Sequence, residues 1–182
     1  MAKVRPLTAD EIEVRVGSVG NGYMEMLLYK NARVDMAMLD EIYGAGNWQR
    51  DHKEVKGVVY CGIGVWDADK SDWVWKWDAG AESYTEKEKG EASDSFKRAG
   101  TNWGIGRELY TSPRIRIEIG TQRKKDGYGY EIIPEQKWLQ YGIYVRGINT
   151  VEENGKYVIK GLVLHQKNKA GDSKIFSWEA DK

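Results

Sequence analysis

The sequence contains very little cysteine and no long apolar run. Its one cysteine, Cys61, excludes an intramolecular disulfide and a four-cysteine zinc site. Proteins without disulfides are typical of reducing compartments, so we expect a cytoplasmic location. No apolar run approaches the roughly 20 residues of a membrane-spanning helix, and residues 1–10 include no apolar signal region. We therefore expect no membrane partner.

The sequence also lacks net charge, since 28 Lys and Arg residues balance 28 Asp and Glu residues. The distribution is uneven, however. Residues 97–125 carry eight basic and two acidic residues, a net charge of +6, so the rest of the chain carries −6. This asymmetry favours one positive surface on an otherwise neutral body. Chance charge on solvated loops would give the same count.

The length and composition indicate a globular protein. Of its 182 residues, 41% are hydrophobic and 31% are charged, which excludes the disordered class of low hydrophobicity. A chain of this length fits one domain that includes residues 1–182.

Two helices are expected from apolar spacing. The first is 32–43, where Asn31 can cap the N-terminus and the apolar residues recur at helical spacing. The second follows a capping box formed by Thr85 and Glu88. Its buried stripe consists of Ala92, Phe96, Ala99 and Trp103.

The remaining segments predict antiparallel strands. Residues 48–80 contain three alternating runs separated by Gly, Asp and Ser turns. After Pro113 we expect further strands near residues 115–119, 141–151, 157–164 and 175–178, with hairpin turns at Asp126-Gly127, Asn154-Gly155 and Ala170-Gly171. The fold class is therefore α+β: an antiparallel β-meander packed against a long helix (a β-β-β-α core), with a β-rich C-terminal part.

Aromatic residues are abundant and unusual in kind, with eight Trp and 11 Tyr against two Phe. Trp73, Trp75 and Trp77 alternate along one expected strand, which places their indoles on one face. We expect most of the aromatic residues to build a β-rich core, although Tyr and Trp also suit interfaces and stacking surfaces.

No reaction centre stands out. Gly104-Ile105-Gly106 closes a helix, whereas a phosphate-binding fingerprint opens one. The acidic stretch 67–78 places Asp72 where a calcium loop requires glycine. His52 and His165 lie far apart in the sequence, and Cys61 is expected to be a core residue. We therefore expect no catalytic residues, no metal and no cofactor.

The basic stretch and the aromatic residues together suggest a binding protein. Single-stranded nucleic acid is held by cations that contact phosphates and by rings that stack on bases. Lys89, Lys97, Arg98 and the 107–125 region can supply the cations, and Tyr29 can supply a ring. The alternative for Lys97 and Arg98 is a solvated helix face with an ion pair to Asp94.

Two sequence blocks resemble the Rad-fifty-two/Rad-twenty-two type of single-strand annealing protein, including its bacteriophage Sak-type branch. The first block is YKNARV at 29–34, continued by LDEIYG at 39–44 and by NW at 47–48. The second is EASDSFKRA at 91–99, continued by WGIGR at 103–107 and by LY at 109–110. The resemblance covers about residues 8–112, and it leaves 113–182 as a β-rich extension of unassigned role.

The resemblance implies a function and a set of site residues. Members of the family bind single-stranded DNA and anneal complementary strands in recombination and double-strand break repair, without nucleotide hydrolysis. They form head-to-tail rings or helical filaments with DNA in a positive outer groove, and a single-strand DNA-binding protein is a further expected partner. The residues that correspond to the DNA-binding positions are Lys97, Arg98, Lys89, Tyr29 and Arg15, and we expect Arg33 and Arg107, which lie in the same two blocks, to bind DNA as well.

Two other functions stay open from the sequence. The many acidic residues are compatible with a metal-dependent nuclease that acts on recombination intermediates. The aromatic surface is compatible with a protein-interaction module. Strand annealing without nucleotide or metal would indicate the annealing protein, and DNA cleavage that depends on magnesium would indicate the nuclease. The absence of salt-dependent DNA binding would indicate the protein-interaction module.

Overall fold

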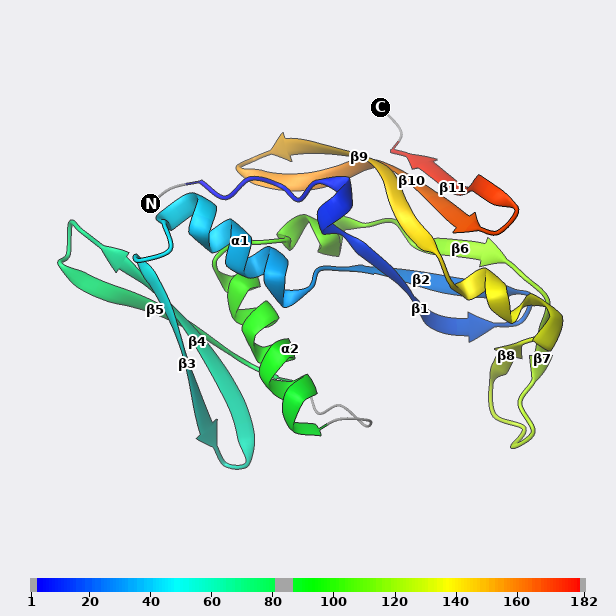
Figure 1. Cartoon of the computed structure of the whole chain (residues 1–182), viewed down its shortest axis with the longest axis horizontal. Coiled ribbons are helices and arrows are strands. Elements are labelled where there is room, and N and C mark those ends of the chain that lie inside the picture. The colour runs from blue at the N-terminus through cyan, green and yellow to red at the C-terminus, as the bar shows by residue number, and fades with distance from the viewer. Residues whose placement is uncertain (1–2, 81–86, 181–182) are drawn as a thin grey trace. The chain divides into compact units, whose positions relative to one another are not determined.

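The structure is a computed structural model that describes residues 3–80 and 87–180, without the side chains of 87–91. It has the expected α+β fold, rich in antiparallel strands. The chain forms two compact units that alternate along the sequence (Figure 1). Unit 1 comprises Met1–Leu7 and Lys30–Arg107, and unit 2 comprises Thr8–Tyr29 and Glu108–Lys182. The expectation of a single domain stays a prediction, because compactness does not show whether the units unfold together.

The first helix of unit 1, α1 (Ala32–Tyr43), has the bounds that the sequence predicts. The Asn31 side-chain oxygen accepts hydrogen bonds from the backbone N–H groups of Arg33 and Val34, at 2.9 and 3.2 Å. These bonds satisfy two of the N–H groups that the first turn of a helix leaves without a partner. Gly44 ends the helix at a positive φ of 82°, which glycine adopts without steric cost.

Three antiparallel strands follow in unit 1, as the sequence predicts: β3 (Trp48–Val55), β4 (Val58–Asp67) and β5 (Asp72–Ala79). Their order in the sheet is β3-β4-β5, so β4 is central. Alternate residues of β4 are buried on one face, namely Cys61, Ile63 and Val65. Because successive side chains of a strand point to opposite faces, this face is the one that packs against the rest of the core.

The second helix, α2 (Lys87–Asn102), covers that buried face of β4 and β5 (Figure 1). Phe96, Ala99 and Trp103 are buried as the helical spacing predicts, whereas Ala92 is only half-buried. Trp103 Nε1 donates to the Ile63 carbonyl oxygen at 2.9 Å. The predicted capping box of Thr85 and Glu88 lies outside the described residues. The predicted β-β-β-α core is therefore confirmed.

Unit 2 begins with an element that the sequence did not predict. After a short 3₁₀ helix, η1 (Ala9–Glu11), strands β1 (Glu13–Gly20) and β2 (Tyr23–Tyr29) form an antiparallel hairpin. The far edge of β2 pairs with β6 (Ile115–Glu118), which gives the order β1-β2-β6.

The C-terminal part of unit 2 is β-rich, as expected. A hairpin of β7 (Thr121–Arg123) and β8 (Tyr130–Ile132) turns at Asp126-Gly127. After the 3₁₀ helix η3 (Pro134–Gln140), three long strands form a sheet of order β9-β10-β11. These strands are β9 (Ile143–Glu153), β10 (Lys156–Asn168) and β11 (Gly171–Glu179), joined by the predicted turns at Asn154-Gly155 and Ala170-Gly171.

The core of unit 2 includes one face of the β9-β10-β11 sheet. Val145, Ile159, Leu162 and Leu164 are buried there. Within the described residues, no helix is long and apolar enough to cross a membrane.

The packing of α2 predicts a large stability cost for one substitution. Phe96 is 1% exposed, so Phe96→Ala leaves a cavity and should lower the free energy of unfolding by about 3–5 kcal/mol. Ser93→Ala on the exposed side of α2 is the control, with an expected change within about 0.5 kcal/mol. Urea denaturation followed by tryptophan fluorescence measures both, and equal midpoints would mean that α2 does not pack through Phe96.

Candidate nucleic-acid interface

Two of the predicted DNA-binding cations lie next to each other on α2. Because Phe96, Ala99 and Trp103 face the sheet, Lys97 is half-buried and Arg98 is exposed. Arg98 Nε lies 2.7 Å from Asp94 Oδ2, one helical turn earlier, so the ion pair considered from the sequence is present. Lys97 makes no ion pair within the described part of the chain. Of the two, the Lys97 ammonium group is therefore the charge that no carboxylate among the described residues neutralises.

Lys89 lies on the same helix, eight residues before Lys97. Its backbone belongs to α2, but its side chain lies outside the described residues. The predicted arrangement of Lys89, Lys97 and Arg98 along a common groove therefore stays a prediction for Lys89.

A buried ion pair supports this part of α2. Lys30 Nζ donates to Asp35 Oδ1 on α1 and, at 3.0 Å, to the backbone carbonyl oxygen of Lys97. Lys30 is 6% exposed and Asp35 is fully buried. The Lys30 side chain thus joins the start of α1 to the middle of α2, and it fixes the backbone that carries Lys97.

Two glycines make room for the buried pair. A Cβ atom at Gly100 on α2 would collide with Asp35 Oδ1. A Cβ at Gly106, which has a φ of +70°, would lie 2.8 Å from Lys30 Cδ. The helix–helix approach that encloses the pair therefore depends on the absence of side chains at these positions.

Asp35 is only partly satisfied. Among the described residues its Oδ2 atom has no hydrogen-bond partner. Burial disfavours the charged carboxylate and raises the pKa of Asp35 to about 6, while Lys30 opposes this shift.

The other two predicted cations of unit 1 lie at helix ends. Arg33 is exposed in the first turn of α1. Arg107 is exposed just after α2, where its Nε and Nη2 atoms donate to the carbonyl oxygens of Thr101 and Asn102 at 2.8 and 2.7 Å. Lys76 Nζ donates to the same Asn102 oxygen at 3.0 Å. Arg107 therefore caps the C-terminus of α2, an arrangement that the helix dipole favours.

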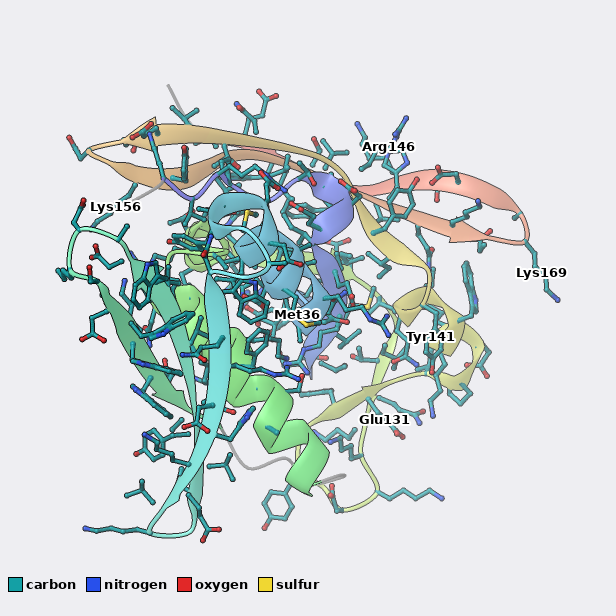
Figure 2. All side chains as sticks on the ribbon, turned by 60° about the vertical axis from the view of Figure 1, so that its left-hand side comes forward. Met36, Glu131, Tyr141, Arg146, Lys156 and Lys169 are labelled. Carbon is teal, nitrogen blue, oxygen red and sulfur yellow. The ribbon has the colours of Figure 1, made fainter. Side chains whose placement is uncertain are left out.

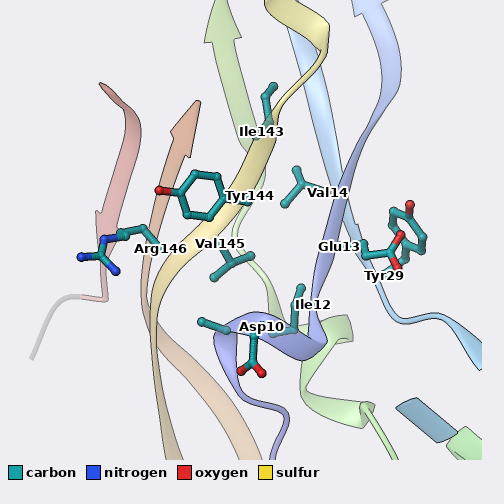
Figure 3. Close-up of a pocket in the computed structure, with 10 residues that line it drawn as sticks. Asp10, Ile12, Glu13, Val14, Tyr29, Ile143, Tyr144, Val145 and Arg146 are labelled. Carbon is teal, nitrogen blue, oxygen red and sulfur yellow. The ribbon is translucent and has the colours of Figure 1, made fainter. Parts of the chain in front are cut away.

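Unit 2 brings Tyr29 and Arg15 together. Arg15 Cζ lies 5.6 Å from the centroid of the Tyr29 ring, within the range of a cation–π contact. Tyr29 is half-buried, and its hydroxyl donates to Glu13, which raises the pKa of Tyr29. Tyr29 lines an open cleft of about 540 Å³ between β1 and β9 (Figure 3). The Tyr29 ring is thus held from one side by a cation and at its hydroxyl by a carboxylate.

An aromatic surface on unit 1 was not predicted as such. Trp75 and Trp77 lie on the face of the β3-β4-β5 sheet opposite α2, where their rings cover Gly64 and Gly62 of β4. The two indoles stack with centroids 5.5 Å apart, and Lys53 Nζ lies 4.2 Å from the Trp77 centroid. Trp66, on the same face, is 41% exposed. The expectation that the aromatic residues mostly build the core is wrong for this group.

The motifs judged unimportant from the sequence have structural roles. The Asp67 carboxylate accepts hydrogen bonds from the backbone N–H groups of Asp69 and Lys70 and so forms the β4–β5 turn. Cys61 is buried, and burial raises the pKa of its thiol to about 11, which disfavours the reactive thiolate. Within the described residues, no three His, Cys, Asp or Glu side chains form a group that could hold a metal ion.

No family model, curated protein or solved structure matches this chain.

The raised pKa of Asp35 predicts how stability depends on pH. The folded protein holds the Asp35 proton more tightly than the unfolded chain does, so the protonated carboxyl adds to the free energy of unfolding below about pH 4. This stabilisation is lost as pH rises to about 6. In urea titrations at a series of pH values, Asp35→Asn should remove this downward trend, because the amide does not titrate. Asp40→Asn on the exposed side of α1 is the control and should leave the trend unchanged. A wild-type stability that rises between pH 4 and 6, with the rise lost in Asp35→Asn, would contradict the assignment.

Proposed function

We propose that the protein binds single-stranded DNA and anneals complementary strands without nucleotide hydrolysis, as an oligomer that acts in recombination and double-strand break repair. The observation that supports this most directly is the Lys97 ammonium group, which makes no ion pair among the described residues, beside the exposed Arg98 guanidinium on α2. Both are suited to contact a phosphodiester backbone.

The way α2 is held favours this role. Its position is fixed on one side by Phe96 and Trp103 and on another by the bond from Lys30 to the Lys97 carbonyl oxygen. Because the backbone of α2 is already ordered, only the side chains lose conformational freedom when a ligand binds. Their contact with phosphates releases counterions, so affinity should fall steeply with salt.

Annealing requires that the base edges of the bound strand stay free of contacts with the protein. Contacts to the backbone hold a strand and keep its base edges accessible to a complementary strand. The nucleic acid then selects its own partner, and the protein accelerates pairing by concentrating and orienting the strands. Tyr29, held beside Arg15, offers a ring on which a base can stack.

Assembly into a ring or helix is supported by the edges of the β3-β4-β5 sheet. Within the described residues, neither β3 nor β5 pairs with a further strand on its outer side, and β3 is exposed along almost its whole length. Edge strands of this kind pair readily with another chain. If β3 of one copy pairs with β5 of the next, the contact is head-to-tail and generates a closed ring or an open helix.

Lys97→Gln tests the phosphate contact. The variant should lower the slope of log affinity against log salt for a single-stranded oligonucleotide by about 0.7, the value of one phosphate contact. Lys56→Gln removes the same charge at the exposed β3–β4 turn and is the control. Fluorescence anisotropy across a salt series measures both slopes.

The same samples test the function as a whole. Complementary labelled oligonucleotides should pair faster with the wild-type protein in the absence of nucleotide and metal, and light scattering should report a mass well above one chain. Loss of labelled DNA that requires magnesium would favour the nuclease alternative. An absence of salt-dependent DNA binding would favour the protein-interaction module, for which the outward tryptophans Trp66, Trp75 and Trp77 provide a surface.

Two substitutions of Tyr29 test whether its ring stacks on a base. Tyr29→Ala should weaken single-strand binding by about 1–3 kcal/mol if the ring stacks on a base. Tyr29→Phe keeps the ring and removes only the hydroxyl that donates to Glu13, so its affinity should stay close to wild type. Anisotropy titrations compare the two variants, with thermal unfolding as the test that both fold. Equal binding by all three proteins would remove Tyr29 from the interface.

A further inference from the structure

A cluster of charged side chains lies on one face of the β9-β10-β11 sheet in unit 2. Tyr144, His165 and Lys174 are directly opposite one another across the three strands, and Lys167 is opposite Asp172. Val145, Leu164 and Gln166, which alternate with these residues along β9 and β10, are buried. The cluster therefore occupies the other, solvent-facing side. We call it the C-terminal cationic face, and it comprises Tyr144, Arg146, His165, Lys167, Asp172 and Lys174.

The one carboxylate of this face is already engaged. Asp172 Oδ2 accepts a hydrogen bond from the Tyr144 hydroxyl at 2.6 Å, and Asp172 Oδ1 lies 3.1 Å from His165 Nδ1. Asp172 thus orients the His165 ring through Nδ1, and within the described residues Nε2 makes no hydrogen bond. The bond from Tyr144 lowers the pKa of Asp172, so this carboxylate stays ionised and holds the two rings in place.

Three further cations surround this network, and the charge of Arg146 acts on Asp172. Arg146, Lys167 and Lys174 are exposed, and within the described part of the chain none of them makes an ion pair. Tyr144 and Arg146 project from the same side of β9 (Figure 3). Three cations thus remain around a single carboxylate, and they come from three different strands.

The spacing of these groups favours an extended anion. Neighbouring strands lie about 4.8 Å apart, so side chains from three strands form a row across the sheet and not a closed pocket. The Tyr144 and His165 rings lie 6.0 Å apart within the row and offer aromatic surface beside the charges. Cations combined with rings along a track are the arrangement by which proteins hold single-stranded nucleic acid.

We propose that the C-terminal cationic face binds the phosphodiester backbone of single-stranded nucleic acid, through Arg146 and Lys174 with His165 between them. This site lies on unit 2, whereas Lys97 and Arg98 belong to unit 1. It gives the β-rich extension a function of its own. The proposal deepens the annealing function and rests on it for its biological use, but the binding itself can be measured separately.

The test is the double variant Arg146→Gln/Lys174→Gln. It should lower the salt slope of oligonucleotide binding by about 1.4, two phosphate contacts, which corresponds to about 25-fold weaker binding at about 0.1 M salt. The control is Lys56→Gln/Lys156→Gln, which removes two exposed charges elsewhere. Lys156 lies at the β9–β10 turn, well away from Arg146 along the same sheet (Figure 2). Thermal unfolding establishes that both proteins fold.

The outcomes separate this proposal from the proposed function. If the two double variants have equal slopes of log affinity against log salt while the wild type still anneals strands, the proposed site is wrong and the proposed function stands. If the wild type binds oligonucleotides through Arg146 and Lys174 but does not anneal them, the site stands and the function is wrong. If the wild type shows no salt-dependent binding, both are wrong.

Discussion

A lysine and an aspartate that water barely reaches connect the two helices of unit 1. A buried charge is costly unless it is paired, so Lys30 and Asp35 constrain everything around them. The pair requires Gly100 and Gly106 to have no side chains, and it places the Lys97 carbonyl oxygen within hydrogen-bond distance of Lys30 Nζ. Any change in the approach of α1 to α2 would expose or separate these charges. The helix that presents Lys97 and Arg98 is therefore held by a polar contact as well as by apolar packing.

The two units offer different kinds of surface. In unit 1 the charges lie on a helix, and the opposite face of the sheet carries stacked indoles above glycines. In unit 2 the charges lie on strands, in a row that a hydrogen-bonded Tyr-Asp-His network organises. Under the proposed function both surfaces contribute, because several weak contacts to a flexible polyanion add up to strong binding while each of them exchanges readily.

Much of the fold could be predicted because its elements obey simple periods. The spacing of Phe96, Ala99 and Trp103 predicts which side of α2 is buried, and Asn31 marks the start of α1. The β1–β2 hairpin could not be predicted in this way, because its register shifts between Val16 and Ser18 and the alternation of side chains is interrupted. The burial of Lys30 has no local signal, since a lysine is exposed by default. The alternation of Trp73, Trp75 and Trp77 predicts a shared face, but only the position of α2 decides that this face is turned outward.

The order in which the chain passes between its units has a consequence during protein synthesis. Strand β2 near the N-terminus pairs with β6, and Lys30 is enclosed beside Gly106. Neither arrangement can close until the ribosome has released most of the chain that forms α2 and β6. In the nascent chain, β2 of the β1–β2 hairpin therefore stays without its partner β6 during this time. Its apolar side chains are then accessible to a chaperone.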